Sequence, residues 1–232
     1  MPLRDVVFIS SQLLTADLWK PQLAAFKGKA NCTVANNSAH NTMSALAASV
    51  LAAAPKSFAL VAHGMGGFIS FEILRQEPAR VEKLVLIGTL APADTAAQTN
   101  RRLGYLKLVQ AGRFADVVNE RIPLMVPSSR YHDMDLIDVV RKMAADTGAD
   151  GFLRQQNAIM NRIDSVPTLA KIACPTLLIW GRSDGLASLD HQKEMLAGIK
   201  YSRLEIVEDC GHLVPLEQPV HASALLMQWL EL

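Results

Sequence analysis

The sequence lacks most features that mark secreted, membrane-bound or nucleic-acid-binding proteins. Its three cysteines are an odd number without a CxxC pair, which excludes a disulfide framework and favours a reducing, cytoplasmic compartment. No apolar run approaches the length that spans a bilayer, and the N-terminus has no signal-peptide pattern. A formal net charge of +1 offers no basic surface for nucleic acid or anionic membranes. None of the six histidines pairs with another at metal-ligand spacing, so we expect neither a metal nor a cofactor.

What is present is a large apolar fraction: half of the 232 residues are hydrophobic, which suits a domain with a sizeable core. Short runs rich in β-branched residues predict strands at 6–10, 32–36, 58–62, 83–88, 176–181 and 203–207. Helical patterns separate most of them, at 18–27, 43–54, 66–77, 188–199 and 220–230. This alternation predicts an α/β fold with a mostly parallel, doubly wound sheet of about six strands.

The alternation stops between residues 92 and 168. Four segments with apolar residues at spacings of three and four predict helices there, and glycines and prolines separate them. We interpret residues 1–91 and 169–232 as the core of one structural domain and residues 92–168 as a helical cap inserted after the fourth strand. A separate all-α domain is the alternative. The segments 101–108 and 154–162 of the cap are expected to line a pocket.

The segment "ALVAHGMGGFISFEIL" (59–74) predicts a strand, a tight glycine-rich turn and a helix. This is the context of a nucleophile elbow, in which residues two before and two after the central position must be small. Ala62 and Gly66 fill those positions, and the central residue is Gly64, which has no hydroxyl. A phosphate-binding glycine loop is the alternative, but the segment has neither the P-loop lysine nor the GxGxxG spacing.

Two further candidates follow later strands. Asp184 lies in a turn after the strand at 176–181, and His212 lies in a loop after the strand at 203–207. Open α/β sheets place their sites at the carboxyl ends of the strands, and the order elbow, acid, histidine fits a catalytic triad. Taken singly, Asp184 is a common Asp-Gly turn and His212 an ordinary loop histidine. Together with the elbow they predict a catalytic group.

The chain resembles the α/β-hydrolase superfamily, and among its members short bacterial proteins similar to 3-oxoadipate enol-lactonase and small carboxylesterases. The matching segments are "LWKPQLAAF", "FALVAHGMGGFISFEILRQEPARVEKLVLIGT", "PTLLIWGRSDGLAS" and "IVEDCGHLVPLEQP". The resemblance implies Asp184 as the acid and His212 as the base, with Gly64 at the nucleophile position. It also implies that the backbone N–H groups of Gln12 and Met65 form the oxyanion hole, and that the chain starts at what is usually the third strand.

The chain departs from such proteins at two places. Gly64 is the first, and its missing side chain leaves space that a water molecule could occupy. The second follows the first strand, where relatives usually show His-Gly or Pro-Gly and this chain has Ser10 and Ser11. Either serine could act as a displaced nucleophile, but a serine that satisfies the backbone of a bend is the favoured interpretation.

Three functional hypotheses remain open. The site could belong to an esterase or lactonase whose nucleophile was lost by design or divergence. It could instead be an enzyme in which His212, held by Asp184, acts as a general base on water or on an acidic substrate proton. A non-catalytic protein that binds a small molecule between core and cap is the third. In each case we expect a small-molecule partner, no nucleic acid and no membrane; a homo-oligomer is possible.

Overall fold

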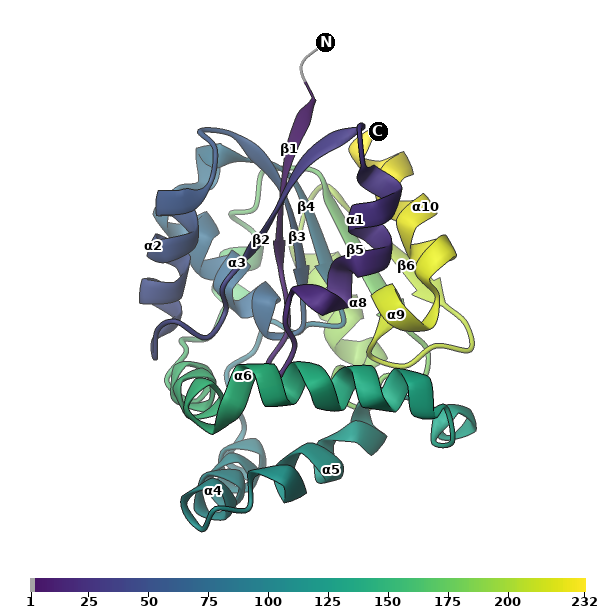
Figure 1. Ribbon diagram of the computed structural model, residues 1–232. Helices are drawn as coiled ribbons and strands as arrows, with labels where there is room; N and C mark the ends of the chain where they lie inside the picture. Colours follow the sequence, from purple (N-terminus) through teal and green to yellow (C-terminus); the bar gives the residue numbers. More distant parts are fainter. Residues whose placement is uncertain (1–2) are drawn as a thin grey trace.

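A six-stranded sheet forms the centre of the computed structural model, which describes residues 3–232 (Figure 1). The strand order is β2-β1-β3-β4-β5-β6, and every pairing is parallel. The strands are β1 (Arg4–Ile9), β2 (Ala30–Ala35), β3 (Phe58–His63), β4 (Val81–Ile87), β5 (Thr176–Gly181) and β6 (Ser202–Val207). All six predicted strands are found within a few residues of their expected bounds, which confirms the predicted fold class.

Helices cover both faces of the sheet. Side chains alternate along each strand, so that Val6 and Phe8 of β1 join one buried cluster while Val7 and Ile9 join the other. The first cluster is closed by α1 (Lys20–Phe26) and α10 (Pro219–Leu230). The second is closed by α2 (Met43–Ala53), α3 (Met65–Gln76) and α8 (Leu189–Gly198).

Three longer helices lie across the end of the sheet at which the strands finish (Figure 1). They are α4 (Ala96–Gln110), α5 (Phe114–Met125) and α6 (Met134–Met160). Gly148, with φ +68°, breaks the helical geometry inside α6, so four helical segments stand where periodicity predicted four. The division into core and cap remains our interpretation. Short helices fill the connections: η1 (Ala16–Trp19), η2 (Pro78–Arg80), η3 (Ser128–Arg130), α7 (Val166–Leu169) and α9 (Val214–Glu217).

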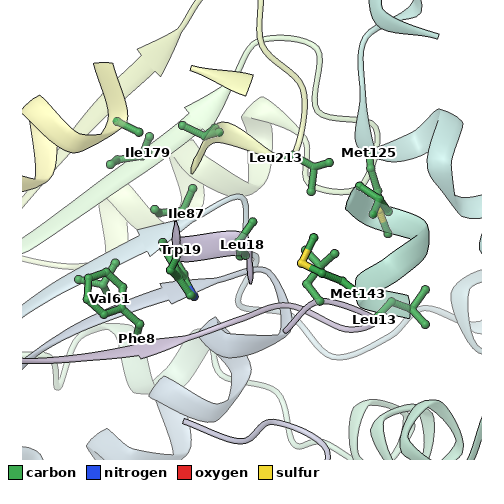
Figure 2. Packing of buried hydrophobic residues seen from close by; sticks show 14 of the residues in the cluster. Phe8, Leu13, Leu18, Trp19, Val61, Ile87, Met125, Met143, Ile179 and Leu213 are labelled. Carbon is green, nitrogen blue, oxygen red and sulfur yellow. The ribbon is translucent and has the colours of Figure 1, made fainter. Parts of the chain in front are cut away.

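The first buried cluster runs without interruption from the sheet into these end helices (Figure 2). On the sheet, Phe8 packs against Trp19 with ring centroids 4.9 Å apart. At the other end of the cluster Leu13, from the loop after β1, lies close to Met143 of α6 (Figure 2). Leu13 therefore anchors the loop after β1 in the core that joins the sheet to α6, which gives its neighbouring residues fixed positions.

Two features are absent from the described part of the chain. No helix within residues 3–232 is both long and apolar enough to span a bilayer. The same residues contain no group of three or more histidine, cysteine, aspartate or glutamate side chains arranged around a common metal position. The three cysteines are free thiols.

Candidate active site

The turn between β3 and α3 has the shape of a nucleophile elbow. Gly64 sits between the two elements with φ +53° and ψ −113°, a backbone conformation that glycine adopts without steric cost. Its N–H donates to the Ile87 carbonyl at 2.9 Å, and its own carbonyl accepts the Thr89 hydroxyl at 2.7 Å. These bonds fix residue 64 at the carboxyl edge of the sheet, and the N–H of Met65 begins the following helix.

The small residues around the elbow are required by close backbone approach. A Cβ on Gly66 would lie 2.4 Å from the carbonyl oxygen of Ile9, and a Cβ on Gly67 would lie 2.3 Å from Thr89 Oγ1. Ala62, two residues before the turn, is fully buried. The elbow can therefore form only with residues of this size at these positions.

Asp184 and His212 meet at the carboxyl ends of β5 and β6. His212 Nδ1 lies 2.8 Å from Asp184 Oδ2, and both side chains are buried, at 3% and 0% exposed. The second carboxylate oxygen, Oδ1, accepts the N–H groups of Leu186 (2.7 Å) and Ala187 (3.0 Å). An aspartate held in this way accepts the Nδ1–H of the imidazole, which leaves the Nε2 lone pair free to take a proton.

Gly88 and His63 lie next to the pair of Asp184 and His212. Gly88 ends β4 with φ +55°, and a Cβ there would lie 2.9 Å from Asp184 Oδ2 and 3.0 Å from His212 Nδ1. His63 Nε2 lies 2.7 Å from the carbonyl oxygen of His212, with the two ring centroids 4.4 Å apart. Burial, and then the nearby charge of His212, hold the pKa of His63 well below its ordinary value, so His63 is neutral and donates from Nε2. These contacts give His63 a structural role beneath His212.

The histidine loop is tied down on both sides of His212. Glu217 Oε1 accepts the N–H of Gly211 at 3.0 Å and the N–H of Leu213 at 2.9 Å. The N–H of His212 itself donates to the Met125 carbonyl, at the end of α5, at 2.8 Å. Burial raises the pKa of Glu217 above its ordinary value, although these N–H groups act in the opposite direction. The position of His212 thus depends on both the sheet and helix α5.

In the loop after β1, Ser10 has the structural role expected of a bend serine. Its hydroxyl donates to the Thr15 carbonyl at 2.8 Å and accepts the indole N–H of Trp19 at 3.0 Å. The side-chain amide of Asn37 donates to the carbonyls of Ser10 at 2.9 Å and Ser11 at 2.7 Å. The path of the loop is therefore set by buried hydrogen bonds.

The next turn of this loop carries Gln12. Leu13 follows with φ +67°, and its N–H donates to Gln155 Oε1 of α6 at 3.1 Å. Gln12 is only 2% exposed, and neither its backbone N–H nor its side-chain amide has a hydrogen-bond partner within residues 3–232. Its backbone N–H is thus available beside the elbow, where the resemblance places an oxyanion donor.

The space above Gly64 is not open, contrary to the expectation that a water molecule could occupy it. A Cβ built on Gly64 would lie 2.1 Å from Ser11 Oγ and 2.8 Å from Ser11 Cβ. The Ser11 side chain therefore fills the position that a nucleophile side chain would take. Both serines were expected to satisfy backbone groups of the bend: Ser10 does so within its own loop, and Ser11 Oγ accepts the backbone N–H of Met65 at 3.2 Å across the elbow. The signal was the replacement of the usual glycine at residue 11.

These residues surround a cavity of about 60 Å³ beneath the end helices. All five predicted site residues meet there, because Gln12, Gly64, Met65 and His212 border the space and Asp184 lies directly behind His212. The two cap segments expected at a pocket wall also contribute, with Arg101 and Arg102 from one and Ile159 from the other. The remaining lining residues are Ser11, Phe68, Gly88, Thr89, Leu90, Asp94, Gln98, Arg121 and Leu186.

The wall of the cavity carries more positive than negative charge. Asp94 is the one lining carboxylate among the described residues, and it is shared by Arg102 at 2.5 Å and Arg162 at 2.7 Å. Burial raises the pKa of Asp94, but the hydrogen bonds and charges of the two arginines outweigh it and bring this pKa below its ordinary value. Asp94 is thus ionised and fully engaged by these two arginines.

Arg121 of α5 is a buried arginine of the cavity wall without such a partner among residues 3–232. It is 6% exposed, makes no ion pair with a carboxylate of residues 3–232, and its Nε has no hydrogen-bond acceptor there. Its guanidinium lies 5.8 Å from the ring centre of Tyr105. Burial, followed by the charge of Arg102, lowers the pKa of Arg121 to about 10. A buried, unpaired guanidinium at a cavity wall is favourable only when an anion compensates it.

Comparison with protein families gives a match over most of the chain. A family model described as the alpha/beta hydrolase fold matches residues 44–219. A curated relative from Escherichia coli K12, 2-hydroxy-6-oxononadienedioate/2-hydroxy-6-oxononatrienedioate hydrolase, is 28% identical over 178 residues. This alignment covers 74% of the present chain and 61% of the relative, so the chain spans about three fifths of the length of that protein.

Solved structures share the fold over nearly the whole chain. An esterase from Thermogutta terrifontis with malate bound aligns with a TM-score of 0.89 and 23% identity, covering 98% of this chain and 89% of the esterase. The enol-lactonase from Burkholderia xenovorans LB400 aligns with a TM-score of 0.89 and 17% identity, covering 100% and 93% of the two chains. At this level of identity the likeness concerns the fold.

Proposed function

Because the chain belongs to the α/β-hydrolase family, we propose that it is an enzyme that hydrolyses small carboxylic esters, lactones or related carbonyl compounds. The observation that carries the proposal is the buried pair of Asp184 and His212, hydrogen-bonded at 2.8 Å beside a cavity. A protein that only binds a ligand has no need of an imidazole that a carboxylate orients at Nδ1, with the Nε2 lone pair directed at the cavity.

The geometry supplies the two functions that acyl transfer needs. His212 Nε2 takes the proton of the attacking hydroxyl and later returns it to the leaving group. The N–H groups of Gln12 and Met65, which flank the same cavity, donate to the oxyanion that develops on the carbonyl oxygen. Neither step uses a metal or a cofactor, and we propose that the substrate lies between the sheet edge and helices α4–α6. A cytoplasmic location is part of the proposal, supported by the three free thiols.

The unpaired charge of Arg121 supports a substrate with a carboxylate group. A substrate carboxylate within the cavity would compensate this guanidinium with charge-assisted hydrogen bonds, and the side-chain amide of Gln12 offers a further donor. The curated relative is named for a dioate, which is a dicarboxylate, and the similar esterase was solved with malate, another dicarboxylate. We therefore propose that anionic esters or lactones are preferred over neutral ones.

A matched pair of substrates tests the proposal: p-nitrophenyl butyrate and mono-p-nitrophenyl succinate, which differ chiefly in the terminal carboxylate. We expect the parent protein to hydrolyse the succinate with the higher kcat/KM, and His212→Ala to lower this value by about 10³-fold or more. The screen is extended to small lactones, neutral and carboxylated. A folded parent protein that turns over no ester or lactone, while carboxylates raise its Tm, would instead show that the protein binds carboxylates without hydrolysing them.

A further inference from the structure

The side chain of Ser11 lies where the nucleophile of such a site is needed. The point that a Cβ on Gly64 would occupy is 2.1 Å from Ser11 Oγ and 3.1 Å from His212 Nε2. One position is thus in contact with both the hydroxyl of Ser11 and the basic nitrogen of the dyad. Ser11 is 6% exposed and lines the cavity in which we propose that the carbonyl compound binds.

The hydrogen bonds of Ser11 differ from those of a structural serine. Ser11 Oγ accepts the N–H of Met65 at 3.2 Å, and its own proton has no acceptor among the hydrogen bonds of residues 3–232. The neighbouring Ser10, by contrast, both donates and accepts within the protein. Buried hydroxyl protons are normally donated, so the free donor on Ser11 is available to His212 or to a ligand.

Glycine at residue 64 is explained by the same arrangement. Any larger residue there would place its Cβ against Ser11 Oγ at a distance that no real contact shows. The residue that relatives usually carry at position 11 is glycine, and the residue that they carry at the elbow is the nucleophilic serine. In this chain the loop after β1 carries serine and the elbow carries glycine. Each substitution makes room for the other.

We infer that Ser11 is the nucleophile of this enzyme: serine and glycine have exchanged places between the loop after β1 and the elbow after β3, and the hydroxyl has stayed at the same site. The inference rests on the proposed hydrolase function. Asn37, which donates to the Ser11 carbonyl at 2.7 Å, and the turn at Leu13 hold the new nucleophile in position.

The reaction proceeds through an acyl-enzyme. Ser11 Oγ forms a bond to the substrate carbonyl carbon as its proton passes to His212 Nε2, and the carbonyl π electrons move to the oxygen. The oxyanion takes over the Met65 N–H that Ser11 Oγ accepts in the free protein, and also bonds to the Gln12 N–H. Collapse breaks the bond to the leaving alkoxide, which receives the proton from His212. Water then attacks the ester carbon as one of its protons passes to His212 Nε2. Collapse of this second intermediate breaks the bond to Ser11 Oγ, which takes the proton back from His212, and the acid is released.

Covalent labelling tests the inference directly. A fluorophosphonate forms a P–O bond with an activated serine and releases fluoride, and the added mass is located by intact-protein and peptide mass spectrometry. We expect one adduct on Ser11 in the parent protein and none in Ser11→Ala, Ser11→Gly or His212→Ala. Ser10→Ala is the matched control: it removes the neighbouring hydroxyl and lowers the Tm, but it keeps the adduct. Ser11→Gly serves if the alanine variant does not fold, since glycine is the usual residue there.

Turnover of mono-p-nitrophenyl succinate is measured on the same variants. Ser11→Ala and Ser11→Gly are expected to lower kcat by about 10³-fold or more, since a nucleophile and its base act as a unit. An active parent whose Ser11 variants keep their activity, or whose adduct lies on another residue, overturns the inference while the hydrolase function stands. A parent that turns over no ester but is labelled on Ser11 overturns the proposed substrates. It supports the inference that the hydroxyl of Ser11 is an activated nucleophile. A parent with neither turnover nor adduct overturns both.

Discussion

The two halves of the site differ in how far they follow the usual hydrolase arrangement. The acid–base half, at the ends of β5 and β6, keeps its aspartate and histidine in hydrogen-bonded contact at 2.8 Å. The nucleophile half, at the ends of β1 and β3, has glycine at the elbow and serine in the adjacent loop. On the role proposed for Ser11, the difference teaches that the position of a hydroxyl in space matters to such a site more than the loop that supplies it.

The two halves differ in how many loops reach the position of the reacting side chain. Around the histidine, Gly88 leaves no room for a side chain, and Glu217 holds the N–H groups on both sides of His212. At the elbow, two loops meet over one small space that holds a single side chain. We propose that either loop can supply that side chain, provided that the other carries glycine.

The largest effect is expected from Asp184→Asn, which tests whether the acid–base half works in the usual way. Asp184 Oδ1 accepts two backbone N–H groups, so the oxygen of an asparagine would remain there and its NH₂ would face His212 Nδ1. The imidazole would then carry its proton on Nε2 and lose its basic nitrogen. We expect kcat to fall by about 10⁴-fold with the fold intact, as measured by steady-state kinetics and circular dichroism.

A variant Asp184→Asn that kept activity within about tenfold of the parent would contradict a histidine base oriented by this carboxylate. Both halves of the site would then depart from the usual hydrolase arrangement, and the acid–base half would no longer serve as the reference for the nucleophile half.

Reversal of the exchange tests the nucleophile half. In Gly64→Ser alone, the new Cβ meets Ser11 and a non-glycine residue adopts φ +53°. The double variant Ser11→Gly/Gly64→Ser removes the collision and keeps only the backbone strain, of about 1–3 kcal/mol. We expect the double variant to have the higher Tm of the two, to be labelled by a fluorophosphonate at position 64, and to retain kcat within about 10²-fold of the parent.

The opposite result is a folded double variant that is neither labelled nor active. It would mean that the loop after β1 had diverged too far for an elbow serine to work, and the two positions would not be interchangeable.

Much of the fold could be predicted because its signals are local. Apolar runs such as those of β3 and β5 are buried on both faces, and the glycines that end helices and strands mark the turns. The small residues of the elbow were identified from spacing alone, and the structure gives the reason as the approach of the Ile9 carbonyl to Gly66.

The role proposed for Ser11 was one of two alternatives that the sequence left open for the serines at 10 and 11. The sequence could not decide between them, since the decision depends on the contact of two loops that are 53 residues apart (64 − 11). Arg121 was missed for a similar reason: helical periodicity places it on α5 but does not show that no carboxylate reaches it. Both residues become meaningful only when the end helices are placed over the sheet.

A smaller effect is expected from Arg121→Met, which separates substrate binding from the chemistry of either half. The loss of charge-assisted hydrogen bonds to a substrate carboxylate should raise KM for mono-p-nitrophenyl succinate about 10–100-fold, with little change in kcat. KM for p-nitrophenyl butyrate should not change. Arg113→Met, at the exposed start of the same helix, is the charge-matched control. Equal losses on both substrates would indicate that Arg121 supports the fold of the cavity wall instead of binding an anion.

The smallest effect is expected from Glu217→Gln, which examines how firmly the acid–base half is held. An amide oxygen at Oε1 can still accept the N–H groups of Gly211 and Leu213, at 3.0 and 2.9 Å, so the histidine loop should keep its position. Burial raises the pKa of Glu217 in the folded state, so the folded protein binds more protons than the unfolded chain. The parent protein therefore loses stability as pH rises from the ordinary carboxyl range through the raised pKa. The Tm of Glu217→Gln minus the Tm of the parent should therefore increase over this pH range. The increase should be about 2–4 °C for each kcal/mol of unfolding free energy that the parent loses. A Tm difference that shrinks or reverses as pH rises would show that the two N–H groups, and not burial, dominate this carboxylate, and that the histidine half is held by an ionised glutamate.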